Sequence, residues 1–221
     1  MRSELKILTF FFTSLWVLTS ESISAKSTVI DSIVLENALV RVQKNETVKT
    51  ATDAAIFGKR VIVALTKLKY KKSGSLKWIQ RGEIIVYLPE EATDIKKGEY
   101  FEVAFKKTHP EPRGPESWLE PQKNKIVYED ETFRVFEERL AAGDTRELHS
   151  HAQRVVVRLN KVQLTDPRFN PNGVPGEGIQ VPNTVKFAEP MIHVVKNLSK
   201  DTPLFNIIIE FKTTVYNNNN K

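Results

Sequence analysis

An internal repeat is the feature of this 221-residue chain that most restricts its fold. The segment "IVLENALVRV" begins at Ile33, and "IVYEDETFRV" begins 93 positions later at Ile126, with Ile, Val, Glu, Arg and Val in common. Further on, "RVIVAL" at Arg60 is matched by "RVVVRL" at Arg154, 94 positions later. Because the matched segments keep their order, we expect two similar structural units.

Both halves consist of short β-branched and aromatic runs that are separated by Gly, Pro, Asn and Asp. No long stretch has the apolar spacing of a helix. The last run of each half closes in Phe-Lys, at Lys106 and at Lys212. Hydrophobic residues make up 40% of the chain, which is enough for one large domain or two small ones. The sequence therefore predicts two all-β units over residues 32–107 and 126–212.

A proline-rich segment separates the two units. Thr108 to Gln122 carries four prolines among polar residues, so residues 108–125 are predicted to form an extended linker or a strand-capping arm. Trp118 within it is expected to pack back onto a barrel. Residues 213–221 include "NNNNK", which is a low-complexity tail.

The N-terminus has the outline of a secretory signal peptide. Arg2 and Lys6 precede the uncharged apolar run Ile7 to Leu18, and small residues follow, so we expect cleavage after Ser24. A signal peptide of residues 1–24 implies a secreted or periplasmic protein, with no membrane contact in the mature form. An uncleaved signal-anchor is the alternative.

Composition narrows the ligands and partners of the chain. There is no cysteine, so the protein folds without disulfides and any metal must be held by His, carboxylate or amide groups. The 33 basic and 27 acidic residues give a net charge of +6, but the basic residues are scattered rather than clustered. We therefore expect a solvated surface and no nucleic-acid partner.

Two of the four histidines stand next to a predicted strand, in "GDTRELHSHAQRVVVRL". Side chains alternate faces along an extended strand, so His149 and His151 point the same way. Two imidazoles on one face are able to share a metal ion. A solvated strand face without a ligand is the alternative interpretation of the pair.

Two separate motifs in this half resemble those of the cupin superfamily. Gly143, His149 and His151 follow the Gly, five residues, His, one residue, His pattern of the first half of the first cupin motif. Further along, Pro190, His193 and Asn197 have the spacing of the second motif. With the repeat, the chain resembles a bicupin, a tandem pair of cupin barrels.

The resemblance implies two tandem jelly-roll barrels, in which inward-facing residues of distant strands meet. It also implies a three-histidine metal site made of His149, His151 and His193. Three neutral imidazoles favour a divalent transition metal such as Fe, Zn, Ni or Cu over Mg or Ca. A small-molecule ligand or substrate is the expected partner, and the sequence leaves open whether the chain forms a homo-oligomer.

The chain departs from the cupin pattern at two places. Val155 and Val156 occupy the positions where the first motif usually has a glutamate, so the carboxylate ligand is missing. Glycine is also absent from the second motif, where Met191 and Ile192 follow Pro190. Glu147 and Gln153 share the strand parity of the histidines and are candidates for an oxygen ligand.

Projection of the site onto the first half predicts that this barrel binds no metal. By the repeat offset His149 and His151 correspond to Ala55 and Phe57, and His193 corresponds to Ala92. None of these side chains is a metal ligand. We therefore expect a degenerate copy with a packed or apolar interior, in which Phe57 acts as a plug.

Two classes of function fit this sequence. The first is an exported metalloenzyme that acts on a small molecule, by dioxygenase, isomerase or lyase chemistry, as the resemblance permits. The second is a binding or sensing protein whose metal is structural or holds a ligand. An acid or base facing inward beside the metal would distinguish the enzyme from the binding protein.

Overall fold

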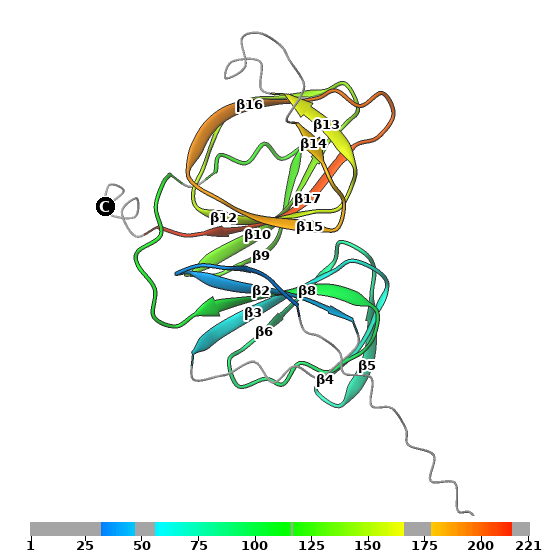
Figure 1. Cartoon of the computed structure of the whole chain (residues 1–221), viewed down its shortest axis with the longest axis vertical. Coiled ribbons are helices and arrows are strands. Elements are labelled where there is room, and N and C mark those ends of the chain that lie inside the picture. The colour runs from blue at the N-terminus through cyan, green and yellow to red at the C-terminus, as the bar shows by residue number, and fades with distance from the viewer. Residues whose placement is uncertain (1–31, 47–55, 116, 166–177, 214–221) are drawn as a thin grey trace, which may run out of the picture.

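The computed structural model describes residues 32–46, 56–115, 117–165 and 178–213 (Figure 1). Residues 1–24 and 214–221 of the predicted signal peptide and tail lie outside this part of the chain. The described residues form seventeen strands and no helix, so none of their segments is a long apolar helix that could cross a membrane.

The strands of the first half are β1 (Ser32–Glu36), β2 (Val40–Glu46), β3 (Phe57–Ala64), β4 (Leu68–Lys72), β5 (Ser75–Ile79), β6 (Ile84–Tyr87), β7 (Ile95–Lys97) and β8 (Glu99–Lys106). Those of the second half are β9 (Asn124–Glu129), β10 (Phe133–Leu140), β11 (Thr145–His151), β12 (Arg154–Arg158), β13 (Val162–Thr165), β14 (Ile179–Gln180), β15 (Thr184–Ala188), β16 (Met191–Asn197) and β17 (Leu204–Phe211).

The strands assemble into two barrels, each made of a large and a small antiparallel sheet. The first barrel has the five-stranded sheet β1-β2-β8-β3-β6 and the three-stranded sheet β5-β4-β7. The second has the five-stranded sheet β9-β10-β17-β12-β15 and the four-stranded sheet β11-β16-β13-β14. The two large sheets have the same strand order, because in each of them the first two strands of the barrel are followed by its last strand. The predicted all-β, two-barrel fold is confirmed, and the domain limits 32–107 and 126–212 stay predictions.

The two large sheets face each other across one shared hydrophobic core (Figure 1). Alternate residues of the repeated strands supply it, including Val61 and Val63 on β3 and Val155 and Val157 on β12. At one end the rings of Phe105 and Phe133 stack with centroids 4.3 Å apart. Since alternate residues of a strand point to opposite faces, the residues between these valines face the barrel interiors.

The two interiors differ in polarity. The first barrel contains a cluster of buried apolar residues: Ile62, Ala64, Leu68, Tyr70, Ile85, Tyr87, Ile95 and Tyr100. Phe57 is buried but is not in this cluster, and the Arg41 guanidinium lies over its ring, 4.8 Å from the centroid. Its predicted role as a plug of the barrel is therefore wrong.

The linker between the barrels runs along the second barrel. Its backbone enters the hydrogen-bond network there, since the amide of Gln153 donates to the carbonyl of Arg113. Leu119 packs on a buried cluster of the second barrel, whereas Trp118 is 63% exposed. The prediction that Trp118 packs back onto the barrel is wrong, because its neighbour Leu119 occupies that position.

Candidate metal centre

The three predicted histidines lie together on the small sheet of the second barrel. His149 and His151 come from β11, and the strand register places His193 of β16 directly opposite His149. The ring centroid of His149 is 4.6 Å from those of His151 and His193, which are 5.3 Å from each other. One candidate ligand nitrogen of each ring lies within 4.8 Å of the other two.

Hydrogen bonds orient two of these rings. The Nδ1 atom of His149 lies 2.7 Å from the carbonyl oxygen of Glu147, so it carries the proton and donates. Its Nε2 atom is then an unprotonated acceptor, and it is buried with no hydrogen-bond partner among the described residues. A buried lone pair of this kind is costly unless a ligand or an ion uses it.

A serine of the linker holds His151 in the same tautomer. The hydroxyl of Ser117 contacts both Nδ1 of His151, at 2.6 Å, and a carboxylate oxygen of Glu210. A carboxylate only accepts, so the single hydroxyl proton goes to Glu210, and Ser117 accepts from Nδ1 of His151. The Nε2 atom of His151 is therefore left unprotonated for a ligand role.

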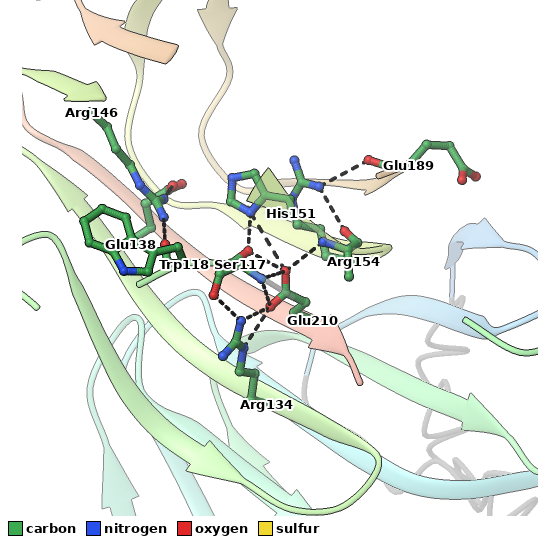
Figure 2. Close-up of polar contacts among 10 residues, drawn as sticks. Ser117, Trp118, Arg134, Glu138, Arg146, His151, Arg154, Glu189 and Glu210 are labelled. Carbon is green, nitrogen blue, oxygen red and sulfur yellow. Dashed lines mark hydrogen bonds and ion pairs between the residues drawn. The ribbon is translucent and has the colours of Figure 1, made fainter. Parts of the chain in front are cut away.

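Glu210 is the centre of a buried polar network beneath His151 (Figure 2). It accepts from Nε of Arg134 at 2.8 Å and from a terminal nitrogen at 2.6 Å, and from the amide of Ala152 at 3.0 Å. Its side chain is fully buried, and Arg134 balances its charge. Such a second layer of contacts fixes the orientation of metal-binding imidazoles.

The surroundings of the three histidines keep them neutral. Burial lowers the pKa of His149, with a further contribution from the nearby charge of Arg146. Burial and then Arg154 hold the pKa of His151 well below its usual range. Burial, and after it His149 and Arg154, lower the pKa of His193 to about 3. Neutral imidazole is the form that binds a metal.

A cavity of about 190 Å³ adjoins two of the histidines, His151 and His193. It lies within the second barrel between its two sheets. Part of its wall is apolar and is made by residues such as Val156, Val195 and Ile208. A small molecule in this cavity would therefore lie beside the histidine rings.

The structure places the other candidates away from the histidine rings. Both polar atoms of the Gln153 amide are used elsewhere, since the oxygen accepts from the amide of Arg113 and the nitrogen donates to Glu189. The side chain of Glu147 is exposed. The fourth histidine, His109, lies exposed in the linker. Neither proposed oxygen ligand therefore reaches the site.

Sequence reasoning missed Ser117, Arg134 and Glu210. Ser117 is in the proline-rich linker, where no side chain is predicted to reach the histidines, and Glu210 lies in the apolar run "NIIIEF". A lone glutamate in such a run was a signal that its carboxylate has a buried partner, since unpaired charges are rarely buried.

The donor set fits a divalent transition metal. Three neutral imidazoles converge, two of them in the tautomer that leaves Nε2 unprotonated, and one of these nitrogens is buried without a partner in the described part of the chain. Imidazole nitrogen suits Zn, Fe, Ni and Cu, whereas Mg and Ca prefer oxygen.

Comparison with solved structures identifies the class of fold. The chain resembles a cupin 2 conserved barrel domain protein from Leptotrichia buccalis, at 11% identity and a TM-score of 0.54, over 86% of this chain and 91% of that one. AerE from Microcystis aeruginosa aligns at 10% identity with a TM-score of 0.48, over 83% of this chain and 98% of that one. No protein-family model and no curated protein sequence matches. The first likeness shows that this chain has the cupin fold.

Proposed function

We propose that this chain is an exported metalloprotein of cupin fold that binds one divalent transition metal through His149, His151 and His193 and acts on a small molecule. The observation that carries the proposal is the buried group of neutral imidazoles beside a cavity. Export rests on the predicted signal peptide of residues 1–24. The proposed partner is a small molecule rather than nucleic acid.

The chain's own residues have separate roles in this proposal. The three imidazoles hold the metal, and Ser117 with Glu210 keeps His151 in the required tautomer. The cavity admits the substrate on the side of His151 and His193. A bound transition metal would supply Lewis acidity, or redox chemistry if it is iron or copper. Dioxygenase, isomerase and lyase reactions are the classes that we propose.

A second candidate function is binding or sensing without turnover, and one observation favours it. Among the described residues that line the cavity, Glu138 is the carboxylate. It is already bonded to Arg146 and to the amide nitrogen of Asn206, at 3.0 Å. It is therefore poorly placed to exchange protons with a substrate. Turnover in a substrate screen of the metal-loaded protein would distinguish the enzyme from the binding protein.

The proposal is tested by elemental analysis and zinc titration of the purified chain. We expect at most one ion per chain in the barrels. His149→Ala, His151→Ala and His193→Ala should each remove most of the binding, since two imidazoles lack the third ligand of the site. His109→Ala is the matched control, because it removes an exposed linker histidine. Zinc binding by His149→Ala as tight as that of the wild type would refute the assignment.

A further inference from the structure

The wall of the cavity opposite the histidine sheet carries a group of basic side chains. Arg154 and Arg158 lie on β12, and Lys186 lies on the neighbouring strand β15. The register pairs Val156 with Lys186 and Arg158 with Thr184, so all three basic residues share the inward face of the sheet. All three line the same cavity as His151 and His193.

These side chains differ from the other basic residues of the barrel interior in their partners. Arg134 pairs with Glu210, and Arg146 pairs with Glu138. Arg158 and Lys186 make no hydrogen bond or ion pair with any described residue. Within the described part of the chain, Arg154 donates only to backbone carbonyls, at 3.1 and 3.2 Å. Among the described lining residues, the carboxylate is thus already neutralised, and the basic side chains leave an excess of positive charge.

The pKa values of all three basic side chains are lowered in this arrangement. Burial lowers the pKa of Arg158, and it lowers that of Arg154 to about 10. Lys186 is solvent-accessible, but desolvation by the barrel wall and then the charges of Arg158 and Arg154 lower its pKa. Like charges placed together without a counter-charge destabilise the folded chain unless an anion joins them.

A buried acceptor lies in the same wall. Asn206 of β17 stands beside Arg158 in the strand register and is 4% exposed. Its amide nitrogen donates to Glu138, while its Oδ1 atom is buried and has no partner among the described residues. A buried amide oxygen is satisfied by a donor, such as a hydroxyl of a ligand. This unsatisfied acceptor points to a ligand independently of the charges.

The volume limits the size of that ligand. At about 190 Å³ the cavity is smaller than the roughly 300 to 1,000 Å³ of pockets that take drug-sized molecules. His151 and His193 belong to its lining, so a ligand held by the basic residues would also adjoin the proposed metal.

We propose that the cavity binds a small oxyanion, a carboxylate or a phosphate of few atoms, between Arg158 and Lys186, with a hydroxyl of the ligand donating to Asn206. This inference names the substrate class of the proposed metal site and rests on the proposed function for the role of that anion. The basic pair recognises the charge, and the position beside the histidines presents the rest of the molecule to the metal.

The test is calorimetric titration of the purified chain, metal-free and zinc-loaded, with three probes. Glycolate carries a carboxylate and a hydroxyl, glycolamide is its neutral analogue, and inorganic phosphate is the alternative oxyanion. Lys186→Met and Arg158→Met remove one positive charge each from the cavity. Lys77→Met removes one from an exposed position of β5 in the first barrel and is the matched control.

We expect glycolate or phosphate to bind, and glycolamide to bind at least about tenfold more weakly, because a charge-assisted hydrogen bond is lost. Lys186→Met and Arg158→Met should each weaken oxyanion binding by about tenfold or more, and Lys77→Met should leave it unchanged. Tighter binding of glycolate than of phosphate would identify a carboxylate, and the reverse would identify a phosphate.

Lys186→Arg keeps the charge and should retain binding, which separates recognition of the anion from a fault in folding. The proposal is overturned if Lys186→Met and Arg158→Met bind the oxyanions as Lys77→Met does, or if glycolamide binds as tightly as glycolate. Because the metal-free chain keeps the basic residues, oxyanion binding without any zinc binding would refute the metal site alone. Zinc binding with no effect of the basic residues would refute this inference alone.

Discussion

Replacement of Glu210 by glutamine is expected to destabilise the folded chain strongly. The side chain of Glu210 is 0% exposed, and the partner that balances its charge, Arg134, is 9% exposed. Glutamine keeps an oxygen that can accept from Ser117 and from the amide of Ala152. It removes the negative charge to which the buried guanidinium of Arg134 donates two hydrogen bonds.

The size of the effect follows from this burial. Breaking a buried ion pair by removing one partner costs about 3 to 5 kcal/mol, because the remaining charge stays desolvated. Two hydrogen bonds from Arg134, at 2.8 and 2.6 Å, point at the carboxylate oxygen and would meet an amide group instead. Glu129→Gln is the matched control, since Glu129 pairs with Lys212 at 2.7 Å while 39% exposed. Such a surface pair is worth about 0 to 1 kcal/mol.

Urea denaturation at neutral pH, followed by circular dichroism, measures both variants against the wild type. The expected result is a free energy of unfolding lowered by about 3 to 5 kcal/mol in Glu210→Gln and by at most about 1 kcal/mol in Glu129→Gln. If the two variants unfold within about 1 kcal/mol of each other, Glu210 is not the buried counter-charge described above. The measurement is made on metal-free protein, so the result is independent of the metal.

Three further predictions concern the histidines and the first barrel. Ser117→Ala removes the acceptor of His151 Nδ1 and should weaken zinc affinity about 10-fold to 100-fold in a chelator competition assay, and an unchanged affinity would remove Ser117 from the site. Phe57→Ala should leave zinc stoichiometry unchanged in elemental analysis, while denaturation should show a loss of about 3 to 5 kcal/mol because the ring is 1% exposed. In the metal-free chain the pKa of His193 is lowered from 6.5 to about 3, so the unfolded chain binds more protons between these values. Stability should therefore fall as pH falls through that window, by up to about 1.4 kcal/mol per pH unit, and His193→Gln should show a shallower fall in urea midpoints at pH 7 and 5.

Local patterns were enough to predict the two all-β units and to bring attention to His149 and His151. Short β-branched runs and a repeat of 93 to 94 positions predicted two all-β units, because the alternation of a strand is a property of adjacent residues. The same alternation put His149 and His151 on one face. His193 was predicted only from the resemblance of its motif, since nothing local in the chain connects it to β11.

Tertiary structure decided which groups surround the histidines. Ser117 reaches His151 from the linker, and Arg158 and Lys186 share a wall because β12 pairs with β15. Strand parity also misassigned Gln153, because it lies beyond the end of β11 and its amide bonds Arg113 and Glu189 instead.

The physical reason for the difference is the range of the interactions. Strand formation and the face on which a side chain lies follow from the local backbone, so sequence period reports them. Burial, charge balance and hydrogen-bond partners depend on which distant strands pair. The shared core between the barrels is such a case. Val61 and Val155 each belong to an ordinary β-branched run, and they come to lie in the same core only because the two large sheets pack against each other.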